Sequence, residues 1–123
     1  MSNSTRNIIA WILQVLAGLA FIFIGGMKVK DLSATLENFT KMGFPAWFGY
    51  LIAFGELLGG IGLLIPRTVR LAAAGLIIIM VGAVYVHLTK IPNGAATVAP
   101  AAALLVILIV IFLLRRPTSS ATV

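Results

Sequence analysis

Cysteine is absent from this 123-residue chain, which also has only three acidic residues and one histidine. Without cysteine, the chain by itself offers no disulfide, no thiol redox relay and no iron–sulfur ligation. A single histidine does not supply both ligands of a bis-histidine haem, and a protein-only metal site normally uses three or four ligands. No serine lies inside the long apolar runs, so no serine nucleophile is predicted there. The sequence therefore predicts no metal site and identifies no catalytic residue.

Hydrophobic residues make up 61% of the chain, and charged residues only 10%. A soluble domain of this size has too little interior to bury so much apolar sequence. A membrane-spanning helix needs about 20 largely apolar residues. The predicted fold class is therefore all-α, a polytopic membrane four-helix bundle that forms a single transmembrane domain over residues 1–123. Its four predicted spans are Ile8–Met27, Ala46–Ile65, Leu71–Leu88 and Val98–Leu114.

The first run is expected to remain in the protein as a span. It is longer than the apolar core of a cleaved signal peptide, and Gly25-Gly26 leads into a lysine-containing segment without a small-residue cleavage site. The segment at about residues 31–42 differs from the spans. Its apolar residues recur at helical spacing with charged residues between them, which predicts an amphipathic helix at the membrane interface that ends at Gly43 and Pro45. The polar tail at about residues 117–123 is predicted to be disordered.

The net charge of +6 does not indicate a nucleic-acid partner, because the basic residues lie at the ends of the predicted spans. Lysine and arginine at these positions face lipid headgroups and determine orientation. We therefore expect the lipid bilayer as partner, the cell inner membrane as location and both termini on the cytoplasmic side. With four spans, the side of the termini carries Arg6, Arg67, Arg70, Arg115 and Arg116, and the other side carries Lys28, Lys30, Lys41 and Lys90.

Glu56 is the one charged residue well inside an apolar run. It follows Trp47 by nine positions, which places it roughly 14 Å along the helix and near the bilayer midplane. A carboxylate at that depth costs roughly 2.5–3.5 kcal/mol, so an embedded acid is by default a functional candidate. A structural ion pair or a hydrogen-bonded neutral acid is the alternative. Burial favours the neutral form, whereas a neighbouring lysine favours the carboxylate, and the residues alone leave both states open.

Three further polar residues are candidates for a cluster with Glu56. Lys28 ends the first span on the side toward which the Glu56 side chain leans, since helical side chains point toward the N-terminus of their helix. His87 lies near the same surface, at the end of the third span, and Gln14 approaches from the other half of the bundle. The predicted ligand-binding residues are Glu56, Lys28, His87 and Gln14. Snorkelling of Lys28, an exposed interfacial His87 and an interhelical hydrogen bond of Gln14 are the structural alternatives.

Several short motifs resemble the DoxX-like family of small integral membrane proteins. They extend over about residues 17–80, and their order and spacing carry the resemblance. The family implies a four-helix membrane bundle, and some members are associated with quinone-linked oxidation of sulfur compounds. Lys28 and Glu56 match recurrent basic and acidic positions of the family. The motifs are Gly25-Gly26-x-Lys28, Met42-Gly43-Phe44-Pro45, the run GELLGGIGLLIP at residues 55–66 and Arg70-Leu71-Ala72-Ala73.

Three functions agree with these features. The first is a DoxX-like bundle that binds a small hydrophobic ligand, a quinone or a lipid, as a subunit of a membrane redox system. The second is a proton-coupled transporter of small molecules that uses Glu56. The third is an accessory subunit that forms a homodimer or joins a membrane partner through glycines such as Gly75 and Gly82. The sequence leaves open whether the chain is an enzyme.

Overall fold

The computed structural model describes residues 2–91 and 93–115, and this part of the chain contains helices and turns but no strand. The all-α prediction is confirmed. The predicted tail at residues 117–123 lies outside the described residues. The helices are α1 (Asn3–Lys30), α2 (Leu32–Lys41), α3 (Ala46–Leu63), α4 (Val69–Thr89), α5 (Gly94–Thr97) and α6 (Ala99–Leu114).

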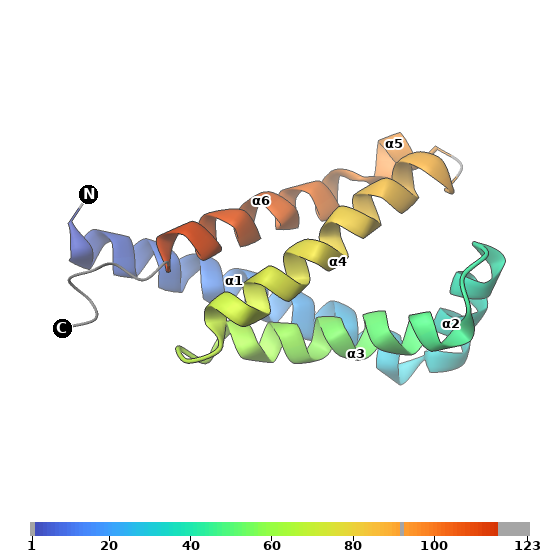
Figure 1. Ribbon diagram of the computed structural model, residues 1–123, viewed down its shortest axis with the longest axis horizontal. Helices are drawn as coiled ribbons and strands as arrows, with labels where there is room; N and C mark the ends of the chain where they lie inside the picture. Colours follow the sequence, from blue (N-terminus) through green and yellow to red (C-terminus); the bar gives the residue numbers. More distant parts are fainter. Residues whose placement is uncertain (1, 92, 116–123) are drawn as a thin grey trace.

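The four long helices form two antiparallel layers that join at one end and diverge at the other (Figure 1). In one layer α1 packs on α3, and in the other α4 packs on α6. At the closed end lie the start of α1, the end of α6 and the turn from α3 to α4, whereas α2 and α5 lie at the open end (Figure 1). The molecule is therefore a V whose opening lies between α3 and α4.

Glycine residues allow α1 and α3 to approach each other closely. A Cβ atom on Gly25 would lie 2.8 Å from the Cα atom of Leu57, and one on Gly60 would lie 2.8 Å from the carbonyl oxygen of Gly18. Contacts of this kind let two helix backbones pack without a side chain between them, as small residues do in membrane helices. Each of these two helices has a buried face that carries small and polar residues, and the two buried faces lie against each other.

The apolar core occupies the closed end of the V, where Phe21, Leu63, Leu76, Leu108 and Ile111 are at most 1% exposed. Many large apolar side chains cover the outer surface instead, which is typical of a protein that contacts lipid. Three helices, α1, α3 and α4, are long and apolar enough to cross a membrane, and α6 is a shorter apolar helix of 16 residues. The described chain is thus a helical membrane protein in which three helices are long and apolar enough to be spans.

Helix α1 begins at Asn3, before the apolar run starts at Ile8. The reason is a cap: the side chain of Ser2 accepts a hydrogen bond from the backbone N–H of Thr5 at 3.1 Å, which satisfies one of the free donors at the helix start. The added turn brings Arg6 to the end of α6, where its Nε donates to the carbonyl oxygen of Leu114 at 2.7 Å. The two ends of the described chain are joined by this contact.

Helix α2 occupies the stretch for which the sequence predicts an amphipathic helix, although its position at a membrane interface stays a prediction. The hydroxyl of Thr35 donates to the carbonyl oxygen of Lys28 at 3.0 Å, so α2 is tied to the end of α1. Gly43, with a φ of 91°, ends the segment in a left-handed conformation that favours glycine. Pro45 then precedes the first residue of α3. This connection holds α2 against α1 and α3 at the open end of the V.

Candidate functional site

A pocket of about 1130 Å³ lies at the open end of the V, between α2 and α3 on one side and α4 on the other. Its walls are mostly apolar, with Leu51, Ile52, Ile78 and Ile79 among the lining residues. A few polar side chains are concentrated toward the end that α2 covers. Ligand sites for small molecules usually have this character, with an apolar cavity and a small number of placed polar groups.

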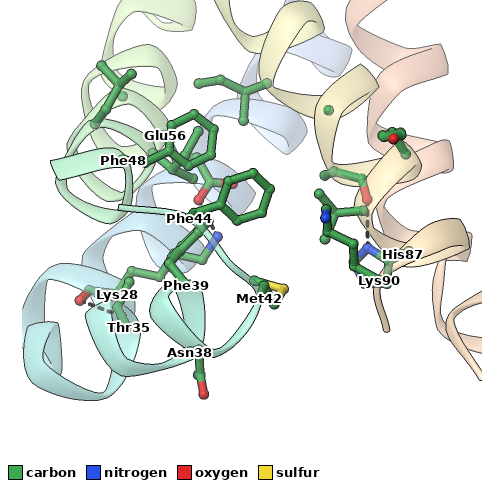
Figure 2. Close-up of a pocket in the computed structure, with 18 of the residues that line it drawn as sticks. Lys28, Thr35, Asn38, Phe39, Met42, Phe44, Phe48, Glu56, His87 and Lys90 are labelled. Atoms are coloured by element: carbon green, nitrogen blue, oxygen red, sulfur yellow. Dashed lines mark hydrogen bonds and ion pairs between the residues drawn. The ribbon is translucent and has the colours of Figure 1, made fainter. Parts of the chain in front are cut away.

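Lys28 and Glu56 form an ion pair on one wall of the pocket, where Lys28 Nζ donates to Glu56 Oε1 (Figure 2). The carboxylate is enclosed, because Glu56 is only 2% exposed, whereas the side chain of Lys28 is 33% exposed. The close contact of α1 with α3 places the two residues together, since Gly25 lies one turn before Lys28 and contacts the backbone at Glu56. Both side chains line the pocket, so the pair offers an ammonium donor and a carboxylate at its surface.

His87 lies on the opposite wall, on the last turn of α4, together with Lys90 (Figure 2). Its Nδ1 contacts the carbonyl oxygen of Ala83 at 2.8 Å, which favours a proton on Nδ1. The other nitrogen, Nε2, makes no hydrogen bond to the described residues. The pocket therefore has hydrogen-bonding groups on two facing walls.

Three phenylalanine side chains at the mouth of the pocket were not singled out by the sequence pattern. Phe39 of α2 meets Phe44 and Phe48 edge to face, with ring centroids 6.1 Å and 5.8 Å away, and Phe44 stacks on Phe48 at 4.9 Å. Lys90 reaches across from α4, with its Nζ 5.7 Å from the centroid of Phe44. The only signal in the sequence was the apolar face of α2, which did not indicate that this face covers a pocket.

Gln14 does not lie in this pocket. It is fully buried near the closed end of the V, where its Nε2 donates to the carbonyl oxygen of Leu63 at 2.8 Å and its Oε1 accepts from Arg115 Nε at 2.6 Å. Of the four predicted ligand-binding residues, the structure thus brings together Lys28, Glu56 and His87 and separates Gln14. Tyr85 also borders the large pocket, but its side chain is 55% exposed.

Within residues 2–91 and 93–115, no three His, Cys, Asp or Glu side chains come together in a group that could hold a metal ion. The polar groups of the large pocket suit a different kind of ligand, one that is mostly apolar and carries an oxygen or another acceptor at one end. The ammonium of Lys28 is the natural donor to such a group.

The fold and this pocket define a small helical membrane protein with a mostly apolar internal site. The model of the DoxX-like family matches residues 12–111, which is most of the chain. This protein belongs to the DoxX-like family, and the family predicted from the motifs is confirmed. The match extends beyond those motifs at both ends and includes most of α6.

One similar protein is a Bacillus subtilis (strain 168) protein named "Putative oxidoreductase CatD". The two chains are 27% identical over 90 residues, which cover 73% of this chain and 67% of the relative. No solved structure matches the chain.

Proposed function

We propose that this protein binds a small hydrophobic ligand with a polar end, a quinone or a lipid, in the pocket between α3 and α4. The observation that carries the proposal is the ion pair of Lys28 with Glu56, a buried charge that opens onto a mostly apolar pocket. An ion pair that served only to join α1 to α3 would not need a pocket beside it. The apolar tail of the ligand lies along α3 and α4, and its polar end lies beside Lys28.

The hydrogen-bond donor and the aromatic side chains of this pocket also suit a quinone, which has ring oxygens that accept hydrogen bonds and a flat ring. Lys28 donates to one ring oxygen, Glu56 keeps the ammonium in place, and Phe44 and Phe48 offer aromatic faces at the mouth. A bound quinone would supply the capacity to accept electrons and protons. Because the chain has no cysteine and a single histidine, the electrons have to come from a partner subunit or another cofactor. The name of the Bacillus subtilis relative supports a place in a redox system.

Binding of a decyl-substituted benzoquinone to the protein in lipid nanodiscs tests this function. We expect Glu56→Gln to weaken binding about tenfold or more, because Lys28 then loses the charge that holds it at the pocket wall. Glu37→Gln is the matched control: Glu37 is 66% exposed and pairs with Lys41 on the surface of α2. Dissociation constants from native mass spectrometry or equilibrium dialysis give the comparison.

Equal dissociation constants for wild type and Glu56→Gln would contradict the proposal. Lipids that co-purify with wild type and are lost in Glu56→Gln would identify a lipid as the ligand. A transporter predicts something different: adding a lipophilic cation would release protons from wild type and not from Glu56→Gln. That result would favour proton-coupled transport over quinone or lipid binding as the function of the large pocket.

We further propose that α6 is a fourth span and that both termini face the cytoplasm. At 16 residues, α6 is about 24 Å long, and α5 and Val98 precede it and extend the crossing. Both described ends of the chain lie at the closed end of the V (Figure 1), which an even number of crossings requires. The arginine-rich character of this end supports a cytoplasmic position.

Fusions at the C-terminus test this topology. A green fluorescent protein fusion is expected to fluoresce, and an alkaline phosphatase fusion is expected to be inactive, because phosphatase folds only after export. A fusion of each reporter after Asn93, in the turn between α4 and α5, is the control and should give the opposite pattern. Phosphatase activity at the C-terminus would contradict the proposed orientation.

A partner subunit or a second copy of the chain has room to bind along α4. Outside α4 itself, no described atom lies within 4 Å of the Cβ position at Gly75 or Gly82, and of these two residues only Gly82 also lines the large pocket. Small residues at such positions allow close helix contacts in membranes. Crosslinking in native membranes distinguishes a homodimer from a heteromeric complex.

A further inference from the structure

Among the described residues, the arginines lie at the closed end of the V and the lysines lie at the open end. Arg6, Arg67, Arg70 and Arg115 lie at the closed end of the V, on the first turn of α1, around the α3–α4 turn and just after α6. The three acidic residues of the chain are Asp31, Glu37 and Glu56, and none of them lies beside these arginines: Asp31 and Glu37 lie between α1 and the end of α2, and Glu56 pairs with Lys28. Among residues 2–91 and 93–115, the closed end therefore carries positive charge with no acidic side chain beside it.

Arg115 is held in one orientation by three neighbours. Its Nε donates to Gln14 Oε1 at 2.6 Å, its Nη1 donates to Asn7 Oδ1 at 2.7 Å, and its guanidinium lies 5.4 Å from the ring centroid of Trp11. Gln14 is in turn fixed by the carbonyl oxygen of Leu63. A planar guanidinium that is held at two nitrogens is preorganised and loses little freedom when it binds an anion.

These contacts engage the side-chain acceptors around Arg115. The amide oxygens of Gln14 and Asn7 both accept from it, and Arg6 already donates to the carbonyl oxygen of Leu114 at the end of α6. The remaining guanidinium nitrogen, Nη2, is buried and has no hydrogen-bond partner among the described residues. The amide nitrogen of Asn7 and the indole N–H of Trp11 are further donors. The site is rich in donors and poor in acceptors.

A small pocket of about 180 Å³ lies against this group and is separate from the large pocket. The pKa of Arg115 is lowered from its ordinary value because the guanidinium is partly buried and because Arg6 carries a like charge. The second cause shows that Arg6 adds positive charge beside the Arg115 guanidinium. The pocket is lined by Asn7, Trp11, Gln14, Pro66, Val69 and Arg115.

We propose that this small pocket is an anion site for a phosphate group, presented either by the headgroup of an anionic phospholipid or by free phosphate. A phosphate brings the negative charge and the acceptor oxygens that the pocket lacks, and arginine binds phosphate oxygens with its paired N–H groups. Trp11 and the arginines lie at the end of the spans, the depth at which phospholipid phosphates occur. This site is distinct from the large pocket at the other end of the V.

The protein as it exists, reconstituted in nanodiscs of phosphatidylcholine with phosphatidylglycerol, provides the test. Native mass spectrometry after release from the nanodisc measures how much of each lipid stays bound. We expect wild type to retain phosphatidylglycerol preferentially and Arg115→Gln to reduce this preference about tenfold. Arg67→Gln is the matched control, because Arg67 is an exposed arginine at the same end that does not line the pocket. It is expected to change the preference less than about twofold.

A second arm adds inorganic phosphate to the protein in phosphatidylcholine nanodiscs and follows Trp11 fluorescence in a Trp47→Phe background, since the chain has only two tryptophans. A fluorescence change that saturates with phosphate and is lost in Arg115→Gln identifies free phosphate as the ligand. Preferential phosphatidylglycerol binding without a phosphate response identifies the lipid headgroup.

Equal losses in Arg115→Gln and Arg67→Gln would overturn the proposal, because they would indicate diffuse attraction by the positive end. No preference for phosphatidylglycerol and no phosphate response in wild type would overturn it as well. Should circular dichroism show that Arg115→Gln does not fold, Asn7→Ala replaces it. Asn7 is exposed on the first turns of α1, and its loss removes a donor and frees one side of Arg115, so at least a threefold reduction is expected.

Discussion

Replacing Lys28 with methionine is expected to lower the free energy of unfolding by about 3–5 kcal/mol, the effect of removing one partner of a buried ion pair. The reason is the difference in exposure between the partners: Glu56 is 2% exposed, so solvent can do little to replace the ammonium. Glu56→Gln is expected to cost less, about 1–2 kcal/mol, because Lys28 is 33% exposed and its ammonium can turn toward the membrane surface.

The double variant Lys28→Met/Glu56→Gln should be more stable than Lys28→Met alone, since no unpaired charge remains buried. Reversible unfolding in mixed micelles gives the three free energies. Lys41→Met is the control, because Lys41 and Glu37 form a surface pair at 3.2 Å with side chains 71% and 66% exposed. That pair is expected to contribute less than about 1 kcal/mol. A Lys28→Met variant no less stable than Lys41→Met would show that Glu56 does not depend on the ion pair.

The second large effect is expected from one methyl group on α1. Gly25→Ala would place a Cβ 2.8 Å from the Cα atom of Leu57, and the contact is with helix backbone rather than with a flexible side chain. The two helices have to separate to accept it, at a cost of about 1–3 kcal/mol or more. Since this contact also positions Lys28 beside Glu56, the variant is expected to weaken quinone or lipid binding in the large pocket.

Gly26→Ala is the matched control, on the same turn of the same helix. No described atom lies within 4 Å of its Cβ position, so the added methyl group meets no obstacle. Alanine favours a helix over glycine by roughly 0.5–1 kcal/mol, so this variant should be equally stable or slightly more stable than wild type. The same unfolding measurement compares both variants. Equal stability of Gly25→Ala and Gly26→Ala would contradict the close packing of α1 on α3.

Some of the site follows from local properties of the sequence. Hydropathy identified Glu56 as an embedded charge because a carboxylate inside an apolar run needs no knowledge of the fold to be recognised. Gly18 and Gly25 are seven positions apart and so share a face of α1, and in the structure both lie at the contact with α3, as does Gly60. The direction in which helical side chains lean indicated that Lys28 and Glu56 approach each other, and they form an ion pair.

Other parts of the site depend on residues far apart in the chain. Gln14 was assigned to the Glu56 cluster because it is a polar residue in a span, but it bonds to Arg115, 101 positions away. Hydropathy does not indicate which distant residue a buried amide will meet. The start of α1 at Asn3 was also missed, since the capping hydrogen bond of Ser2 extends the helix through a polar segment that hydropathy leaves outside the span.

The sequence by itself determined the class of the protein, the helical membrane character and the presence of one charged residue embedded in an apolar helix, because composition and periodicity act over a few turns of chain. Only the tertiary structure decided where the polar residues meet. The glycines of α1 and α3 bring these helices together, while α4 diverges from α3 toward the end that α2 covers, and the large pocket follows from that divergence. The angle between two packed helices depends on how the side chains of both fit together, so it cannot be read from either segment of the sequence alone.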